Sequence, residues 1–505
     1  MTQLNGSPQA IAIGEGYAVR APGIRGAADL SRPSTTADRA RGRGPNDGTE
    51  DLDRALAATN VTEVRQVDVR LQPTPPAEAT RALRSVDGQE TIELQAPDLG
   101  PETGQLVLAC DETGVVTWHL PVDDALQVQT PTSRGSGNVK RFRIPATQPR
   151  PASPAESTQR SLLGVVGRKL LKVLVFPVLD PVIGAISETF TERWEAKNHP
   201  YGLRAFSPAD RRTPGAGALA ASDWDRLTAG RALLFIHGTF STAHAAFNQI
   251  PDPTFEELYR RYGERVFAFN HFSMAHGPKQ NIQWLLEQLP AGRSLEVDIV
   301  CHSRGGLVAR TLAEGAFGLD ASRVKVRRIV FVGVPNQGTM LVHPDHMIKM
   351  IDRFTSALNL FPSGPVAETL EALITAVKVI GHGALGGLDG LRSMQPGGAF
   401  LGQLNQGTAS GGDYYGIAAD FEPGDGDQGL KALLTGKVDS LVDRCFETAP
   451  NDLVVPQIGV YDGNGSAGFP IPDERLLKVP PAARVIHTTL FGYPPTSAKL
   501  TEWLG

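Results

Sequence analysis

Six short apolar runs recur along the sequence from residue 231 to residue 505, and turn residues and helical patterns separate them. Strands that are apolar on both sides are typical of a parallel sheet covered by helices on both faces. The sequence therefore predicts an α/β fold for this region. The expected strands, in chain order, are ALLFIHG, RVFAFNHF, LEVDIVCH, VRRIVFVGVP, YYGIAADF and ARVIHTTLF.

A long stretch with helical patterns and glycine breaks separates the fourth run from the fifth. It exceeds an ordinary connection between a strand and the next one, which is usually a few residues beyond its helix. We expect a helical cap over about residues 340–412, because long insertions of this kind commonly cover an active site.

The chain before residue 231 divides into three parts. Residues 1–55 are rich in Gly, Ala, Arg, Ser, Thr and Pro, and we expect them to be disordered. Residues 56–146 alternate apolar and polar positions between turn signals, which favours a small β-rich domain resembling a sandwich. Residues 147–230 are expected to be a linker followed by an amphipathic helical arm.

The arm, residues 162–186, is the most apolar stretch, but charged residues and prolines interrupt it, so it is not expected to span a membrane. On a helix, Arg168, Lys169 and Lys172 would share one sector opposite a wide apolar face. A helix packed on the protein's own core is the favoured interpretation. A basic amphipathic helix in peripheral contact with an anionic membrane is the alternative.

Composition narrows the functional classes. The net charge of −5 and the pI near 6.2 argue against a nucleic-acid partner, which would need a basic surface. The three cysteines lie far apart, so no disulfide framework is expected. The first twenty residues lack the pattern of a secretory signal, and we expect a cytoplasmic protein.

The segment DIVCHSRGGLVAR, residues 298–310, nearly matches G-x-S-x-G, the strand-to-helix turn that exposes a nucleophilic serine. Cys301 stands at the first glycine position, where a small side chain is needed. Ser303 is the favoured nucleophile, since Cys301 belongs to the strand and would point into the sheet. A structural crossing with an incidental serine is the remaining alternative.

A second segment, LLFIHGTFS at residues 233–241, ends a strand with His-Gly and a small residue. Such a turn brings a backbone amide to the edge of the sheet. We expect the amides of Thr239 and Arg304 to bind the oxyanion of an acyl-transfer reaction. A plain glycine turn is the alternative.

The expected base is His487, which lies in RVIHTTLF near the last predicted strand. His271 and His276 precede the serine in the chain, and His382 belongs to the expected cap. The base normally follows both serine and acid in this class of site, which favours His487.

The expected acid is Asp452, in NDLVVP between the fifth and sixth predicted strands. A carboxylate at this point in the chain can orient the imidazole of the base and stabilise its cation. Asp420 and Asp425, close to the end of the fifth strand, are the alternatives.

Metal and nucleotide sites have little support. The cluster HPDH at residues 343–346 offers His343, Asp345 and His346 but lacks further ligands, so a solvated helix start is favoured. No G-x-x-x-x-G-K-[ST] motif occurs. We expect neither a metal nor an organic cofactor.

HGTF, CHSRGGLVAR, VFVGVPNQGT, SMQPGGAFLGQLN, NDLVVP and VIHTTLF, in that order, resemble the lipase and esterase branch of the α/β-hydrolases, including bacterial lipases and PGAP-type lipid esterases. The resemblance covers about residues 231–505. It implies an α/β-hydrolase fold, the triad Ser303, Asp452 and His487, and oxyanion donors at Thr239 and Arg304. Cys301 and Gln337 depart from the usual pattern.

Together these features predict a serine hydrolase that cleaves carboxylic esters, with a small-molecule or lipid ester as its substrate. An acyltransferase with the same triad is one alternative. The other is an inactive hydrolase-fold protein that binds partners through its β-rich domain and arm.

Overall fold

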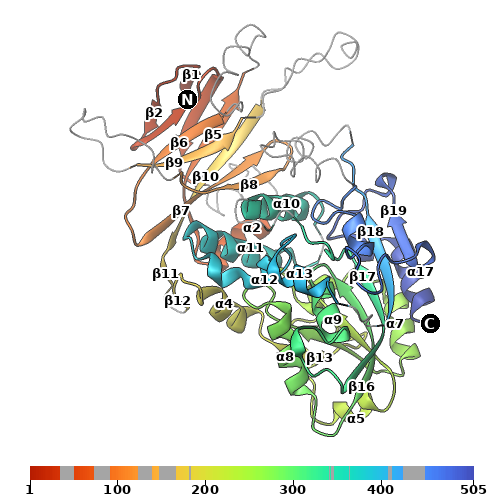
Figure 1. The fold of residues 1–505 in the computed structure, drawn as a ribbon. Helices are drawn as coiled ribbons and strands as arrows, with labels where there is room; N and C mark the ends of the chain where they lie inside the picture. Colours follow the sequence, from red (N-terminus) through yellow and green to blue (C-terminus); the bar gives the residue numbers. More distant parts are fainter. Residues whose placement is uncertain are drawn as a thin grey trace. The chain divides into compact units, whose positions relative to one another are not determined.

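The computed structural model describes residues 1–33, 50–72, 91–122, 139–146, 167–180, 183–339, 342, 346–362, 364–407, 412–424 and 450–505. These residues form two compact units, one ending at Asp180 and the other made of the described residues from 183 onward (Figure 1). None of the helices in the described ranges is both long and apolar enough to cross a membrane.

The first unit contains two antiparallel sheets that share one core. The larger has the order β1 (Thr2–Asn5), β4 (Arg25–Ser31), β5 (Thr62–Leu71), β10 (Gly167–Pro177), β7 (Thr103–Asp111) and β8 (Val116–His119). The smaller has the order β2 (Ile11–Gly14), β3 (Tyr17–Arg20), β6 (Thr91–Pro97) and β9 (Val139–Pro145). Side chains from both sheets, such as Val67 and Leu94, are fully buried together, which confirms the sandwich-like domain.

The prediction that residues 1–55 are disordered is wrong for residues 2–31, which form four of these strands. Val19, Ile24 and Ala28 are fully buried, because each short strand pairs with a strand from later in the chain. Several of the few apolar residues of this segment lie at buried positions, and the average composition of the segment does not reveal them. Residues 34–49 lie outside the described residues, and α2 (Glu50–Ala58) follows them.

The predicted amphipathic arm is also wrong as a helix, because residues 167–177 form β10 in the middle of the larger sheet. β10 pairs with β5 on one side and β7 on the other. Lys172 is fully buried there, and its ammonium group lies 3.1 Å from Asp53 Oδ1 and 3.6 Å from Glu63 Oε2. A short apolar run fits a buried strand as well as a helix, so periodicity alone was misleading. β10 is thus neither the favoured helix packed on the core nor the alternative, a basic helix on a membrane. Residues 147–166 of the expected linker lie outside the described residues.

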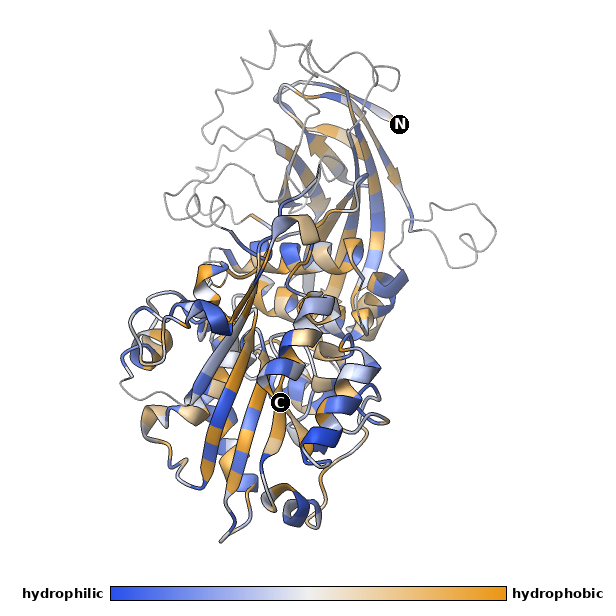
Figure 2. Cartoon of the chain, turned by 90° about the vertical axis from the view of Figure 1, so that its right-hand side faces the viewer, coloured by the Kyte–Doolittle hydropathy of each residue, from blue (hydrophilic) through white to orange (hydrophobic). Residues whose placement is uncertain are grey.

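The second unit is built on one sheet in which all strands are parallel except the first. Its order is β13 (Gly202–Ala205), β15 (Val266–Asn270), β14 (Ala232–Ile236), β16 (Leu295–His302), β17 (Val324–Val332), β18 (Asp413–Ala419) and β19 (Leu476–Val479). Orange hydrophobic bands alternate with blue ones along the strands (Figure 2). The strands β14, β15 and β16 are buried over most of their length, as helices on both faces require.

Helices cover both faces of this sheet. On one face α7 (Asp252–Arg261) and α17 (Pro494–Trp503) share a buried core with the strands. Elsewhere α8 (Pro278–Gln288) packs on α9 (Gly305–Ala313), and α9 contacts β16 and β17. The shorter helical elements are α5 (Asp223–Thr228), α6 (Ala243–Ala246), η1 (Ala316–Gly318), α16 (Ile458–Tyr461) and η5 (Asp473–Arg475). This layered arrangement confirms the predicted α/β-hydrolase fold.

The insertion between β17 and β18 is helical, as predicted for the cap. Its elements are α10 (Met347–Leu360), α11 (Val366–Gly381), η4 (Leu385–Leu388), α12 (Asp389–Arg392) and α13 (Ala399–Leu404). α10 packs on α11. Both have long runs of buried residues, so the insertion carries apolar surface of its own.

Two predicted details of this unit are wrong. The run ARVIHTTLF is not a strand, because its residues lie in a loop between η6 (Pro481–Ala483) and η7 (Leu490–Gly492), and the last strand is β19. The prolines before it and the left-handed backbone of Arg484 (φ 52°) end the strand pairing. The unit also begins before residue 231, since β12 (Gly184–Ala185), α4 (Phe190–Asn198) and β13 lie within the expected linker.

Candidate active site

Ser303 occupies a sharp turn between β16 and α9, with a left-handed backbone (φ 52°) that is unfavourable for a residue with a side chain. Its amide donates a hydrogen bond to the Val332 carbonyl (2.9 Å), which anchors the turn to the neighbouring strand. A Cβ atom on Gly305 would collide with the carbonyl oxygens of Ile236 and His237. The second glycine position of the motif is therefore required by close packing, as in a nucleophile elbow.

Cys301 is fully buried within β16, two residues before the serine of the turn, so it is not placed at the elbow. Its Sγ lies 3.4 Å from the Val330 carbonyl oxygen. Burial raises the pKa of this thiol well above its ordinary value, so the reactive thiolate is disfavoured.

His487 and Asp452 form a buried pair. The Nδ1 atom of His487 lies 2.7 Å from Asp452 Oδ2, and the His487 amide donates to the Asp452 backbone carbonyl (2.9 Å). The other carboxylate oxygen accepts hydrogen bonds from the amides of Val454 (3.0 Å) and Val455 (2.7 Å). Since Nδ1–H donates to the carboxylate, Nε2 keeps the lone pair that a general base needs.

This pair lies against the elbow. A Cβ atom on Gly333, the residue after Val332, would be 3.2 Å from both His487 Cε1 and Asp452 Oδ2. His302, next to Ser303, directs its Nε2 atom at the His487 carbonyl oxygen (3.0 Å). The structure thus brings together the three residues expected as the triad.

One contact of a working triad is not formed. His487 Nε2 is buried without a hydrogen-bond partner among the described residues, and Ser303 Oγ makes no hydrogen bond to it. Catalytic hydrogen bonds are often long or poorly aligned before substrate binds. One of the two side chains must move before a proton can pass between them.

The alternative acids are placed elsewhere. The amide of Asp420 donates to the Val479 carbonyl oxygen (3.0 Å), and its partly buried carboxyl makes no hydrogen bond to His487. Burial raises the pKa of Asp420. Asp425 lies outside the described residues.

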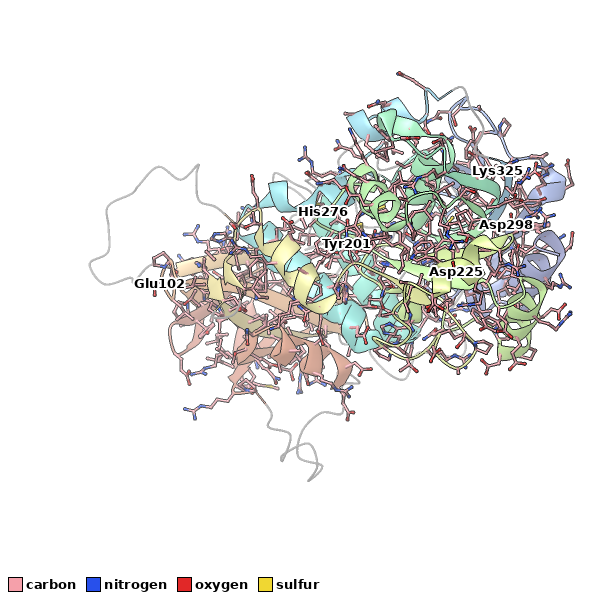
Figure 3. The ribbon with its side chains drawn as sticks, turned by 90° about the horizontal axis from the view of Figure 1, so that it is seen from below. Glu102, Tyr201, Asp225, His276, Asp298 and Lys325 are labelled. Atoms are coloured by element: carbon pink, nitrogen blue, oxygen red, sulfur yellow. The ribbon has the colours of Figure 1, made fainter. Side chains whose placement is uncertain are left out.

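The alternative histidines have other partners. His271 stacks on His237 with ring centroids 4.2 Å apart, and burial lowers the pKa of His271 to about 3. His276 lies beside Tyr201 (Figure 3), whose hydroxyl is 3.0 Å from His276 Nδ1. His382 follows the end of α11.

The HPDH cluster gives no metal centre within the part of the chain that is described. His343 and Asp345 lie outside it, and His346 directly precedes α10. Among the described residues, no group of three or more His, Cys, Asp or Glu side chains could hold a metal ion.

The expected oxyanion donors lie next to the serine. A Cβ atom on Gly238 would be 2.6 Å from Ser303 Cβ, so the loop that carries Thr239 passes directly over the elbow. Neither the Thr239 amide nor the Arg304 amide donates a hydrogen bond within the described residues. Two free amides beside a serine are what an oxyanion needs, and α9 begins immediately after Arg304.

Sequence analysis missed the residues that hold these donors. The Arg304 guanidinium is fully buried and donates from Nε to the Gly390 carbonyl oxygen (2.8 Å) and from Nη2 to Asn281 Oδ1 (3.0 Å). The loop that carries Thr239 is held by Ser273, whose hydroxyl accepts a hydrogen bond from the Phe240 amide. Glu195 in turn accepts a hydrogen bond from the Ser273 amide. They carry no motif, so only their contacts in the folded chain reveal them.

A model of the family described as "Domain of unknown function (DUF7379)" matches residues 198–505, which is more than half of the chain. The chain belongs to the DUF7379 family. No curated protein matches this DUF7379 chain in sequence.

Several solved structures resemble the DUF7379 protein at low identity. Phospholipase PlaB from Legionella pneumophila is 13% identical with a TM-score of 0.29, and the match covers 46% of this chain and 45% of that one. Lipase 1 from Pelosinus fermentans is 12% identical with a TM-score of 0.36, over 54% of this chain and 97% of the lipase. A structure from a study of carboxylesterases of Nitrososphaera gargenis is 12% identical with a TM-score of 0.29, over 55% and 90% of the two chains. The DUF7379 chain therefore spans less than half the length of the phospholipase.

The candidate site of the DUF7379 protein is covered by apolar side chains. Phe354 of α10 packs edge-on against the His487 ring, with centroids 5.8 Å apart. Met394 Sδ lies 4.0 Å from the Thr239 hydroxyl. Only 3% of Ser303 and 2% of His487 are exposed, so a ligand could reach them only after the cap or its neighbouring loops move.

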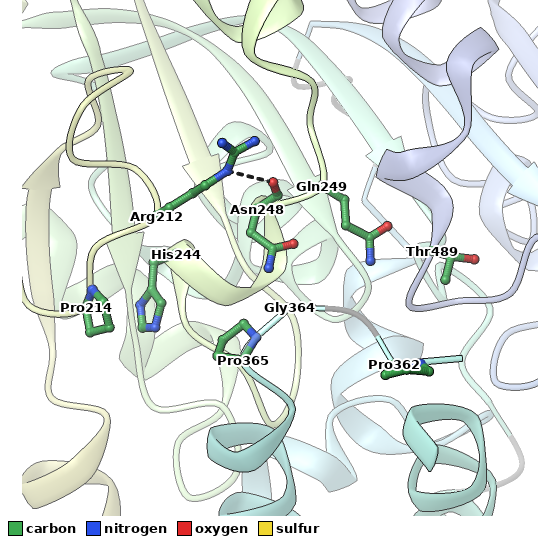
Figure 4. A pocket seen from close by; sticks show the side chains of 9 residues that line it. All are labelled: Arg212, Pro214, His244, Asn248, Gln249, Pro362, Gly364, Pro365 and Thr489. Carbon is green, nitrogen blue, oxygen red and sulfur yellow. Dashed lines mark hydrogen bonds between the residues drawn. The ribbon is translucent and has the colours of Figure 1, made fainter. Parts of the chain in front are cut away.

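A cavity of about 620 Å³ lies beside the loop that carries His487 (Figure 4). Thr489, two residues after His487, lines it, and the turn between α10 and α11 forms part of its wall. The remaining lining residues are Arg212, Pro214, His244, Asn248, Gln249, Pro362, Gly364 and Pro365. The cavity thus lies between the turn that joins α10 to α11 and the loop that carries the candidate base.

Proposed function

We propose that this DUF7379 protein is a serine hydrolase that cleaves carboxylic esters through an acyl-enzyme on Ser303. The observation that carries the proposal is the combination, at one elbow, of a serine at φ 52°, two amides that donate no hydrogen bond within the described residues, and the His487–Asp452 pair. Each feature alone occurs for structural reasons. Their convergence on one side chain is the arrangement that acyl transfer requires.

The first half of the reaction forms the acyl-enzyme. Ser303 Oγ bonds to the ester carbonyl carbon while its proton passes to His487 Nε2, and the amides of Thr239 and Arg304 bind the resulting oxyanion. Asp452 stabilises the imidazolium that forms. The intermediate then collapses: the bond to the alcohol oxygen breaks, and the leaving alcohol takes the proton from His487.

The second half releases the acid. Water attacks the acyl carbon and gives a proton to His487, and Ser303 regains that proton as the bond to its oxygen breaks. The serine chemistry uses no metal or organic cofactor. Phe354, Phe240 and Met394 close to the site support an ester with an apolar acyl group.

The low exposure of Ser303 supports a second candidate, acyl transfer to an alcohol in place of water. A covered site limits access of bulk water to the acyl-enzyme, so an alcohol that binds beneath the cover could take the place of water as acceptor. The two candidates share the first half-reaction. They differ in the products that form when an alcohol is added to the assay.

The test uses the full chain and a series of p-nitrophenyl esters from acetyl to palmitoyl. We expect release of nitrophenol, a preference within the series, and a loss of about 10⁴-fold or more in kcat for Ser303→Ala. Cys301→Ala is the matched control and should keep activity, because Cys301 only packs within β16. Activity retained by Ser303→Ala would contradict the proposal, and no turnover of any ester would favour a binding role for this fold.

A further inference from the structure

The carboxylate of Glu195 on α4 is fully buried and holds a loop that neighbours the candidate site. Its Oε1 atom accepts hydrogen bonds from the amides of Ser273 (2.6 Å) and Met274 (3.1 Å), and its Oε2 atom accepts one from the Ala275 amide (2.9 Å). Three successive amides directed at one carboxylate fix the backbone of this loop. Glu195 therefore determines where residues 273–275 lie.

Ser273 connects this loop to the expected oxyanion hole. Its hydroxyl donates to Glu195 Oε1 (3.3 Å) and accepts a hydrogen bond from the Phe240 amide (3.2 Å). Because a carboxylate only accepts, it directs the Ser273 hydrogen toward itself and leaves the oxygen lone pairs facing Phe240. The Phe240 amide is thus held through Ser273 by Glu195.

The conformation of Phe240 makes this hydrogen bond consequential. Phe240 has a left-handed backbone (φ 57°), which is strained for a residue with a side chain and persists only where its surroundings impose it. It directly follows Thr239, the proposed first oxyanion donor. If the turn at Phe240 relaxed, the peptide between Thr239 and Phe240 would rotate, and the backbone of Thr239 that carries the proposed donor would shift with it.

The second donor is anchored to the same loop. The Arg304 guanidinium donates from Nη2 to the carbonyl oxygen of His276, at the end of the loop. Its Nε atom binds the Gly390 carbonyl oxygen, and the Gly390 amide in turn donates to the Met274 carbonyl oxygen (2.7 Å). The residues on both sides of the proposed oxyanion therefore depend on the loop that Glu195 holds.

Charge links the two anchors as well. Burial raises the pKa of Glu195 to about 7, and burial lowers the pKa of Arg304 to about 10. In each case the charge of the other residue acts against the shift. The two side chains therefore stabilise each other's charged form in a region without solvent.

We infer that Glu195 is a positioning residue of the oxyanion hole, acting through Ser273 on the loop of Thr239 and through residues 274–276 on Arg304. This inference rests on the proposed function of Ser303. It assigns a role in the reaction to α4, which lies before every motif of the α/β-hydrolase resemblance. Glu195 touches no reacting atom.

The test compares Glu195→Gln with Glu192→Gln in the full chain. The first variant keeps the shape of the side chain but turns its amide nitrogen toward an amide donor. The second removes the same charge from the same helix at a side chain that is 51% exposed, and its 3.4 Å ion pair is with the His276 ring and not with the His276 carbonyl oxygen that Arg304 binds. For Glu195→Gln we expect kcat to fall about 10- to 100-fold with KM little changed, because oxyanion contacts strengthen in the transition state. Glu192→Gln should match the wild type.

A second readout separates positioning from folding. Phosphonylation of Ser303 by a fluorophosphonate also develops charge on an oxygen, so its rate should fall by the same factor as kcat in Glu195→Gln. A variant that only unfolds in part would lose active enzyme while each remaining molecule reacted at the wild-type rate. Titrating the fraction of protein that becomes labelled distinguishes these cases.

A double-mutant cycle tests the route through Ser273. Ser273→Ala should lower kcat by a similar factor. The double variant with Glu195→Gln should lose less kcat than the product of the two single losses, because both substitutions break the same route. Wild-type kcat and phosphonylation rates in Glu195→Gln, or independent effects in the cycle, would overturn the inference while Ser303 remained the labelled nucleophile. A wild-type chain that is not labelled at Ser303 would overturn the proposed function and this inference together.

Discussion

The two sides of Ser303 are built differently. On the base side, His487 and Asp452 contact each other directly through side chains that perform the proposed chemistry. On the oxyanion side, the proposed donors are backbone amides, and their placement depends on Ser273 and Glu195. Chemistry done by side chains restricts residue types, whereas chemistry done by amides restricts only geometry. The base side could therefore be found in the sequence, and the support of the oxyanion side could not.

The base side should show the largest effect of a single substitution. We expect His487→Ala to lower kcat by about 10⁴-fold or more, since His487 is the proposed acceptor of the serine proton. His382→Ala is the control, because this histidine lies at the end of α11 and has no contact with the elbow. Steady-state kinetics on one ester measures both. A comparable loss in His382→Ala alone would indicate that His382, in the cap, is the base.

Replacing the acid should have the next largest effect. Asp452→Asn keeps the shape of the side chain but no longer stabilises the imidazolium or fixes its tautomer, so we expect a loss of about 10²- to 10⁴-fold in kcat. Asp420→Asn should leave kcat unchanged, because Asp420 makes no hydrogen bond to His487. The reverse result would show that the Asp452–His487 contact is structural only.

The oxyanion side can be disturbed without replacing any polar side chain. A Cβ atom introduced by Gly238→Ala would lie 2.6 Å from Ser303 Cβ and 3.3 Å from its Oγ, so the loop of Thr239 must shift. We expect kcat to fall about 100-fold, similar to the loss of one oxyanion donor. Gly402→Ala on α13, where the new atom meets nothing within 4 Å, should behave as wild type. Equal kcat values for the two variants would argue against the loop as part of the site.

The buried carboxylate of the oxyanion side should also appear in the pH dependence of stability. Because burial raises the pKa of Glu195 from 4.5 to about 7, the folded protein binds a proton in this range that the unfolded chain does not. The free energy of unfolding should therefore fall, relative to Glu195→Gln, as the pH rises from about 4.5 to above 7, by at most about 3 kcal/mol. Urea unfolding of both proteins at several pH values measures this difference. Parallel curves would mean that Glu195 has an ordinary pKa and that its surroundings are more polar than the contacts indicate.

The fold was predictable from the sequence where apolar runs were long and flanked by helices. Five of the six strands expected in the sheet of the second unit occur, because central parallel strands need continuous apolar residues. The sixth, ARVIHTTLF, has the right composition but follows two prolines and pairs with no strand. Its place is taken by LLKV at β19, a shorter and less apolar segment whose pairing with β18 the sequence pattern does not reveal.

The first unit shows where the fold could not be predicted from the sequence. Residues 2–31 are mostly small and polar, yet they form strands because partners from residues 62–71 and 91–97 cover them. Lys172 is a charge in a central strand, which sequence reasoning assigns to an exposed surface, and it is matched by Asp53 and Glu63. In both cases the deciding contact lies far away in the sequence, so local patterns cannot supply it.

The central claim is that Ser303 is a nucleophile activated by its surroundings, and the most direct measurement is the site of reaction with a fluorophosphonate. Intact-mass and peptide analysis of the full chain should show one phosphonyl adduct, on Ser303, that forms with the wild type and with Cys301→Ala but not with Ser303→Ala. An unlabelled wild-type chain, or an adduct that persists in Ser303→Ala, would contradict the account.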